Sequence, residues 1–284
     1  MMNRDNPVWL ITGCSSGFGR ELAKLVLARG WRAVVTARDP STVADIAATH
    51  ADRALVMPLD VTRRAQIDEV VAGAKRRFGR IDALVNNAGY GYLAAIEEGE
   101  DEAVRALFEA NVFGLIDMTK AVLPIMREQR GGLIVNVSSI GGLTSQAASG
   151  YYHGTKYAVE GISESLAAEV KPLGIDVLIV EPSAFRTNWA GPSIKQSATH
   201  IDAYAATAGE RRKQIEARSG KQPGDPVRAA QAIIDAALSD APPLRLLLGK
   251  AALNLARKKL DFMRNDFDTW ESTTLGADFP ETAG

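Results

Sequence analysis

The chain has 284 residues and a mass of 30.4 kDa, with 46% hydrophobic and 24% charged residues, which suffices for a substantial core in one large domain. Its formal net charge of −1, without a basic block, gives no reason to expect a nucleic-acid partner or an anionic membrane. Cys14 is the only cysteine, so no disulfide can form within the chain, which favours a reducing compartment. The first residues lack the apolar region of a signal peptide, and no run approaches membrane-spanning length. We therefore expect a cytoplasmic protein without a transmembrane segment.

The first predicted elements are a buried strand at Val8–Ile11, a glycine-rich turn at Thr12–Gly19 and a helix over Arg20–Arg29. Glycines in such a turn let the backbone approach a pyrophosphate, and the helix N-terminus supplies amide donors and a favourable dipole. The spacing is Gly-x-x-x-Gly-x-Gly, not the usual Gly-x-Gly-x-x-Gly of dinucleotide sites. The turn predicts a phosphate-binding site that includes Gly13, Ser15, Ser16, Gly17, Phe18 and Gly19.

Strand and helix patterns alternate along the rest of the chain without an internal linker. Near-continuous apolar runs predict six further strands, at Ala33–Thr36, Ala54–Leu59, Ala83–Val85, Leu133–Val137, Val177–Val180 and Leu244–Leu248. Helical patterns fill the gaps, notably at Gln66–Phe78, Asp101–Arg130, Tyr151–Lys171 and Pro226–Ser239. This alternation predicts an α/β fold: a Rossmann-type, doubly wound, seven-stranded parallel sheet with helices on both faces, in a single domain over residues 1–284. Ligands of such sheets bind at the carboxyl ends of the strands, where Thr12, Asn86 and Ser139 all fall.

Tyr152 and Lys156 lie four residues apart at the start of a predicted helix, and therefore on one face. A free phenol ionises near pH ~10, and an adjacent cation favours the phenolate and brings it into range for acid–base work. Ser139 follows an apolar run thirteen residues upstream of Tyr152. Tyr151 and Ser138 are weaker candidates, because no lysine follows Tyr151 by four residues and strand alternation directs Ser138 away from Ser139.

Taken together, these motifs resemble the short-chain dehydrogenase/reductase family in its single-domain branch. The resemblance extends through about residue 190 and rests on Thr12–Gly19, Asn86-Asn87-Ala88-Gly89, Asn111, Ser139, Tyr152 and Lys156, in the family's order. It implies an NAD(P)-dependent oxidoreductase that acts on a carbonyl or alcohol and forms a homodimer or homotetramer. Tyr152 would donate a proton to the carbonyl oxygen, and Lys156 would lower the pKa of the phenol and hold the nicotinamide ribose. Ser139 would bind the substrate oxygen and stabilise the charge that develops there.

The resemblance also assigns roles to further residues. Asn111 would fix a water that links Lys156 to solvent as a proton relay; alternatively, it is a polar helix residue that bonds a neighbouring loop. Cofactor contacts are implied for Asp60, Val61, Asn87, Ala88, Gly89, Pro182 and Thr187, besides Tyr152 and Lys156. Asp60 is equally suited to cap a helix that starts near Thr62. Ser183 departs from the family, which usually has glycine after the proline.

The end of the second predicted strand bears on the choice of cofactor. An acidic residue about twenty positions past the glycines would hydrogen-bond a ribose 2′-hydroxyl and repel a 2′-phosphate. Ala37 stands at the aligned position, followed by Arg38, whose guanidinium can bind a 2′-phosphate through two hydrogen bonds. We therefore predict NADP as the cofactor rather than NAD. If the strand ends two residues later, Asp39 takes the acidic role instead.

Two later segments carry apolar side chains outside the predicted core. Residues 189–222 are predicted to form a substrate cap, in which Trp189, Ile194, Ile201 and Tyr204 favour an apolar substrate. The C-terminal extension at 250–284 contains Leu253, Leu260, Phe262, Met263, Phe267 and Trp270, and we expect it to fold back on the chain or to cover a neighbouring subunit. It resembles the tail of family members related to steroid and retinol dehydrogenases, which points to bulky apolar substrates.

Two other classes of protein are compatible with parts of this pattern. A catalytically idle NADP-binding regulator could share the fold, although the intact Ser139, Tyr152 and Lys156 set argues against it. A nucleotide-sugar epimerase or dehydratase of the extended branch would share the tyrosine and lysine, but usually carries a larger C-terminal substrate domain. The histidines have no metal-ligand spacing, so no metal site is predicted at His50, His153 or His200.

Overall fold

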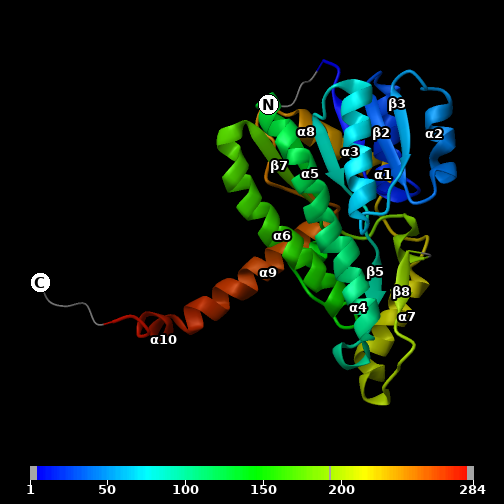
Figure 1. Cartoon of the computed structure of the whole chain (residues 1–284). Coiled ribbons are helices and arrows are strands. Elements are labelled where there is room, and N and C mark those ends of the chain that lie inside the picture. The colour runs from blue at the N-terminus through cyan, green and yellow to red at the C-terminus, as the bar shows by residue number, and fades with distance from the viewer. Residues whose placement is uncertain (1–4, 192, 280–284) are drawn as a thin grey trace, which may run out of the picture.

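A computed structural model, which describes residues 5–191 and 193–279, contains a seven-stranded parallel sheet with helices on both faces (Figure 1). The strand order is β3-β2-β1-β4-β6-β7-β9, and every pair of neighbours is parallel. The strands are β1 (Val8–Ile11), β2 (Arg32–Ala37), β3 (Ala54–Pro58), β4 (Ala83–Asn86), β6 (Gly132–Val137), β7 (Ile175–Pro182) and β9 (Arg245–Leu248). The predicted fold class is confirmed. Strands β2 and β3 lie on one side of β1, and β4 and the later strands of this sheet lie on the other. At this reversal of strand order, a crevice opens between the carboxyl ends of β1 and β4.

Side chains that alternate along each strand divide the core into two layers. Trp9 and Ile11 of β1 pack on one face, under α1 (Gly17–Ala28) and α8 (Pro226–Leu238). Leu10 faces the opposite layer, under three helices: α3 (Arg64–Phe78), α5 (Gly114–Gln129) and α6 (Gly150–Val170). Because both faces of the sheet are covered, its strands are almost entirely apolar, which is the reason that they could be predicted.

The structure differs from the expected elements in several places. The helix predicted over Asp101–Arg130 is divided into α4 (Asp101–Phe108) and α5 by a π-helical turn at Glu109–Phe113, a local irregularity often found at functional sites. Unpredicted short elements are α2 (Ala44–Ala48), β5 (Gly91–Leu93), β8 (Ile194–Gln196) and α7 (Glu210–Ala217). These segments are too short to show a hydrophobic period, and they depend on tertiary contacts.

Residues 189–222, predicted as the cap, are joined to the main body through backbone pairing and a buried ion pair. Strand β8 pairs in parallel with β5, which lies just after β4. Beyond β5, the Glu98 carboxylate is buried and accepts hydrogen bonds from the backbone N–H of Ala95 and Ile201, each at 2.9 Å. Arg212 of α7 donates to the same carboxylate at 2.7 Å and is itself buried, and this hydrogen bond lowers the pKa of Glu98 to about 2. Glu98 therefore joins two segments of the cap, at Ile201 and Arg212, to the segment that follows β5.

The C-terminal extension forms α9 (Lys250–Thr269) and α10 (Glu271–Leu275), and it leaves the body (Figure 1). Ala252 and Ala256, in the first turns of α9, are buried, whereas every described residue from 260 to 279 is exposed. The expectation that this segment folds back on its own chain is therefore wrong, because α9 continues straight past the edge of the sheet at β9. The alternative, that it covers a neighbouring subunit, stays a prediction. None of the helices within the described ranges has the length and apolarity needed to cross a membrane.

The buried ion pair of the cap generates a stability prediction. Arg212→Met should lower the free energy of unfolding by roughly 3–5 kcal/mol, because it leaves the Glu98 carboxylate buried without its counter-charge. Lys213→Met, at the exposed neighbouring position, is the matched control and should change that free energy by less than about 0.5 kcal/mol. Urea denaturation measures both, and the Glu98→Gln/Arg212→Met variant should recover most of the loss. Equal stability of the two single variants would show that the pair does not hold the cap.

Candidate active site

The turn after β1 has the backbone geometry that its glycines allow. Gly13 and Gly17 have φ of +71° and +60°, in the left-handed region that favours glycine. A Cβ on Gly19 would lie 2.5 Å from Nδ2 of Asn87 and 2.6 Å from the carbonyl oxygen of Gly13, so close packing requires glycine there too. Ser16 precedes α1 without a side-chain cap, and the first turn of α1 has no acidic residue. The amides of this helix end are therefore suited to a phosphate group.

Hydrogen bonds join this turn to the end of β4. The Thr12 hydroxyl accepts from the backbone N–H of Asn87 at 2.9 Å and of Ala88 at 3.0 Å. In return, the Asn87 amide donates to the carbonyl oxygens of Thr12 at 2.9 Å and Gly13 at 3.0 Å. Next in the chain, a Cβ on Gly89 would lie 2.9 Å from Oδ1 of Asn111. The predicted cofactor residues that follow β1 and β4 are thus held side by side.

The segment after β7 approaches the same turn from the other side. Pro182 is the buried last residue of β7. A Cβ on Gly17 would lie 3.3 Å from Cβ of Thr187, and the ring of Phe18 meets that of Phe185 edge-on at 5.1 Å between centroids. Chain segments about 170 residues apart in the sequence thereby converge at the start of α1.

Arg38 is the first residue after β2 and is exposed. Among the described residues, no hydrogen bond or ion pair engages its guanidinium. Asp39, the alternative ribose ligand, instead caps the following turn, because its carboxylate accepts from the backbone N–H of Ser41 at 2.9 Å. Strand β2 ends at Ala37, so the alternative register, in which the strand extends two residues further, does not occur.

Asp60 and Val61 follow β3 and lie beside this region. The Asp60 carboxylate accepts from the backbone N–H of Thr62 at 3.0 Å and from its hydroxyl at 2.7 Å. Burial raises the pKa of Asp60, but these hydrogen bonds and the charge of Arg38 hold it below the ordinary value. The expectation that Asp60 caps the next helix is wrong, since α3 begins at Arg64 and Asp60 closes the preceding turn. Val61 is buried in the core layer under α3 and α5.

Ser139, Tyr152 and Lys156 come together at the carboxyl end of β6. The Ser139 hydroxyl accepts from the backbone N–H of Gly141 at 3.0 Å, and its proximity lowers the pKa of the Tyr152 phenol. The ammonium of Lys156 donates to the carbonyl oxygen of Val137 at 2.8 Å and lies 5.7 Å from the centroid of the Tyr152 ring. Tyr152 and Lys156 are both buried, so the loss of hydration shifts the charge state of each group.

The protonation states differ from those expected from the sequence. Burial raises the pKa of Tyr152 to about 12, and the nearby Ser139 hydroxyl opposes only part of this shift. Burial lowers the pKa of Lys156 to about 8, although the charge of Glu160 works in the other direction. Desolvation of the phenol therefore dominates its pKa, and the ammonium of Lys156 is directed at the carbonyl oxygen of Val137; that Lys156 lowers the pKa of the phenol stays a prediction. At neutral pH the phenol carries its proton and the lysine its charge.

Asn111 occupies the π-helical turn and is buried. Its amide donates to the carbonyl oxygen of Tyr90 at 2.9 Å and to the Thr155 hydroxyl at 3.2 Å, and its oxygen accepts from the backbone N–H of Tyr90 at 3.0 Å. Asn111 therefore fastens the segment after β4 to α6, one residue before Lys156. This is the loop-bonding arrangement; the relay role stays a prediction.

Aromatic side chains surround Tyr152 on the side of the cap. The rings of Tyr152 and Trp189 are 5.2 Å apart between centroids, and Tyr92 is buried in the same cluster. Tyr151 does not compete for the acid role, because its hydroxyl donates to the carbonyl oxygen of Ile96 at 2.6 Å. Within the described residues, no group of three or more His, Cys, Asp or Glu side chains could hold a metal ion.

A buried charged cluster below Lys156 was not predicted. Glu160, one turn further along α6, and Glu181, near the end of β7, are buried and share Arg245 of β9 at 3.3 and 3.0 Å. Burial and the neighbouring Glu160 raise the pKa of Glu181. The i, i+4 spacing from Lys156 to Glu160 was visible in the sequence, but the strands that bring the other two residues to it were not.

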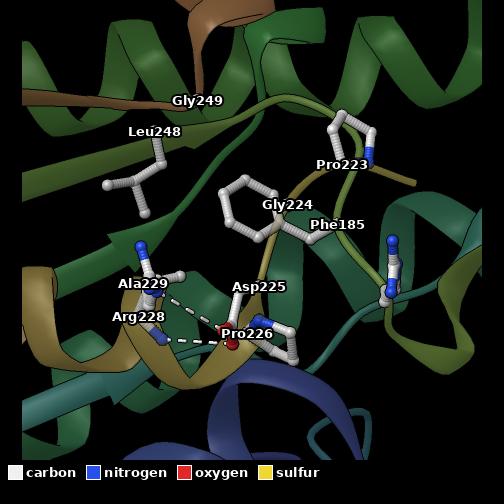
Figure 2. A pocket seen from close by; sticks show the side chains of 10 residues that line it. Phe185, Pro223, Gly224, Asp225, Pro226, Arg228, Ala229, Leu248 and Gly249 are labelled. Atoms are coloured by element: carbon white, nitrogen blue, oxygen red, sulfur yellow. Dashed lines mark hydrogen bonds and ion pairs between the residues drawn. The ribbon is translucent and has the colours of Figure 1, made fainter. Parts of the chain in front are cut away.

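A separate hollow of about 640 Å³ lies at the carboxyl ends of β7 and β9 (Figure 2). Phe185, Leu248 and Gly249 line it together with the start of α8. Asp225, which also lines it, uses its carboxylate to cap α8 by accepting from the backbone N–H of Val227 at 2.8 Å. This hollow adjoins the segment that leads to Thr187, but Tyr152 does not line it.

Comparison with known proteins agrees with this geometry. The family model for short chain dehydrogenases matches residues 7–198. The oxidoreductase BOA17 of Botryotinia fuckeliana is 35% identical over 95% of this chain and 98% of its own. The 3-ketodihydrosphingosine reductase of Bacteroides thetaiotaomicron is 35% identical over 84% of this chain and 87% of its own.

Solved structures show the same relationship. The crystal structure of a short-chain dehydrogenase from Streptomyces avermitilis, 44% identical, superposes with a TM-score of 0.90 over 98% of this chain and 100% of that one. Other solved structures of this fold hold NAD in one protein and NADP in another. The family match spans the turn after β1, the end of β4, Ser139, Tyr152 and Lys156. The chain is therefore a member of the short-chain dehydrogenase family of oxidoreductases.

Proposed function

We propose that this protein is an NADPH-dependent reductase of an apolar ketone or aldehyde. The observation that carries the proposal is the buried pair of Tyr152 and Lys156, with Ser139 near enough to the phenol to lower its pKa. This group lies at the same edge of the sheet as the glycine turn. When bound there, a nicotinamide cofactor would supply the hydride, and the chain would supply orientation and the proton.

The proton chemistry follows from the environments of the three side chains. The Ser139 hydroxyl would donate a hydrogen bond to the carbonyl oxygen and stabilise the negative charge that develops on it. An alkoxide is a far stronger base than a phenolate, so it would take the Tyr152 proton even though burial raises the pKa of that phenol. The charged Lys156 would then stabilise the phenolate. A phenol protonated at neutral pH favours work in the reductive direction.

Arg38 supports NADP as the cofactor. The carboxylate of Asp39, the nearest acidic group in sequence, is held by Ser41, whereas the Arg38 guanidinium is exposed at the end of β2. A 2′-phosphate at this place would gain two hydrogen bonds and a charge interaction from Arg38. Asp60 and Val61 would line the adenine side, and the turn over Gly13–Gly19 with Asn87, Ala88, Gly89, Pro182 and Thr187 would line the rest.

The aromatic surroundings of Tyr152 support an apolar substrate. Trp189 and Tyr92 lie on the side of the phenol that the cap covers, and residues 189–222 would close over the substrate there. A similar protein is named for reduction of 3-ketodihydrosphingosine, which is consistent with a bulky apolar ketone. We also expect the enzyme to work in the cytoplasm, since its only cysteine, Cys14, cannot form a disulfide within the chain.

The first prediction concerns the acid. Tyr152→Phe should lower kcat for NADPH-dependent ketone reduction roughly 10²–10⁴-fold, while NADPH binding persists, because only the proton donor is removed. Tyr151→Phe is the matched control and should keep most activity. Lys156→Ala should lose turnover together with much of the NADPH affinity. A panel of apolar ketones, including 3-ketodihydrosphingosine, provides the assay; a wild-type protein that binds NADPH but reduces none of them would favour the idle regulator.

The second prediction concerns the choice of cofactor. Arg38→Ala should weaken NADPH by roughly ten- to a hundredfold and NADH far less, since a charge-assisted hydrogen bond contributes about 1.5–3 kcal/mol. Ala37→Asp should reverse the preference by placing a carboxylate where the 2′-phosphate would lie. Fluorescence titration of both cofactors against the three proteins measures these affinities. Preference of the unaltered protein for NADH would refute the role given to Arg38.

The third prediction concerns pH. Lys156 has a pKa of about 8, so ketone reduction should slow as the pH rises through this value and the ammonium is lost. The charge of Glu160 raises the pKa of Lys156, so Glu160→Gln should move the fall in kcat to lower pH. Glu169→Gln, at an exposed position of the same helix, should leave the profile unchanged. Identical profiles for both variants would mean that Lys156 does not set the alkaline limb.

A further inference from the structure

Helix α9 carries a regular apolar stripe, which the body covers at Ala256 and which is exposed from Leu260 onward. Leu253, Ala256, Leu260, Met263, Phe267 and Trp270 follow one another at alternating intervals of three and four residues. This is the a and d spacing of a coiled-coil seam, which places all six on one side of the helix. Leu260, Phe267 and Trp270 are 62%, 63% and 61% exposed. A stripe of this size in water indicates a surface that a partner covers.

The charges of this segment are arranged against its own helix dipole. Five basic and five acidic residues lie between 250 and 278. Most of the basic ones come first, at Lys250, Arg257, Lys258 and Lys259, with Arg264 after them; apart from Asp261, the acidic ones follow, at Asp266, Asp268, Glu271 and Asp278. A helix by itself is stabilised by the opposite order, with acids at its N-terminus and bases at its C-terminus. This order suits a second helix that runs in the opposite direction.

We propose that the segment from 253 to 270, the arm, pairs in antiparallel fashion with the arm of a second copy of this chain. Leu260 then faces the partner's Met263, and Leu253 faces the partner's Trp270. Flanking this seam, Lys259 meets the partner's Asp266, and Lys250 meets the partner's Glu271. One flanking contact, between Arg257 and the partner's Arg264, joins like charges. The twofold symmetry of the pair repeats each contact.

Charge excludes the two other obvious arrangements. In a parallel pair, Lys259 would meet the partner's Arg264 and Asp266 would meet the partner's Glu271, so both flanking contacts would repel. An anionic membrane surface attracts helices with an excess of basic over acidic residues, and this segment has equal numbers of both. An antiparallel second copy both covers the apolar stripe and places most of the flanking charges opposite charges of the other sign.

Cysteine cross-linking in the full chain distinguishes these arrangements. Positions 253 and 270 lie about 25 Å apart along the helix, so a disulfide between them cannot form within one arm. A mixture of Leu253→Cys and Trp270→Cys chains should cross-link under mild oxidation, whereas neither variant should cross-link alone. The natural Cys14 is buried and does not interfere. Cross-linking of each variant with itself, or of none, would overturn the proposal.

Charge reversal tests the pairing by a second route, with the same mixed cross-link as the readout. Lys259→Asp should slow cross-linking roughly tenfold, because two attractive contacts become repulsive. Adding Asp266→Lys should restore the rate. Lys258→Asp, which points away from the seam, is the matched control. Equal rates in all three backgrounds, or binding of the unaltered chain to phosphatidylserine vesicles with loss of the cross-link, would contradict pairing with a second copy.

Discussion

The hydrogen bonds between the ends of β1 and β4 are the constraint on which the rest of the site depends. Thr12 and Asn87 exchange side-chain and backbone hydrogen bonds, so the glycine turn and the β4 loop keep one relative position. Gly19 lets α1 approach this junction closely, since a Cβ would collide with Asn87. At the crevice where the strand order reverses, the backbone amides at the start of α1 are thereby held in place, an arrangement suited to a phosphate group.

Burial controls the chemistry at the other end of this crevice. Tyr152 and Lys156 are taken out of water together, and desolvation moves both pKa values toward the neutral forms. The charged cluster of Glu160, Glu181 and Arg245 lies just behind Lys156 and partly offsets this effect for the lysine. A protonated phenol beside a cationic lysine is the pair that the proposed reduction would use. The charge state of Lys156 therefore depends on residues of α6, β7 and β9 as well as on the motif itself.

Cap and extension depend on a different principle from the sheet. Both segments lie outside the two apolar layers, so individual polar and apolar contacts decide their positions. Glu98 and Arg212 hold the cap through one buried ion pair, whereas the distal arm has no covering surface among the described residues of this chain. The strands of the parallel sheet are covered by helices of the same chain, whereas an amphipathic helix beyond the edge of the sheet needs a partner to cover its apolar side.

The sequence by itself determined the seven strands, because strands covered on both faces are apolar throughout and stand out between helical patterns. It also placed Ser139, Tyr152 and Lys156 together, since an i, i+4 pair shares a helix face and parallel strands end at one edge. Tertiary structure alone decided the protonation of Tyr152, the caps made by Asp39 and Asp60, and the direction of α9. Each of these depends on desolvation or on contacts between segments far apart in the chain, and neither leaves a periodic signal in the order of residues.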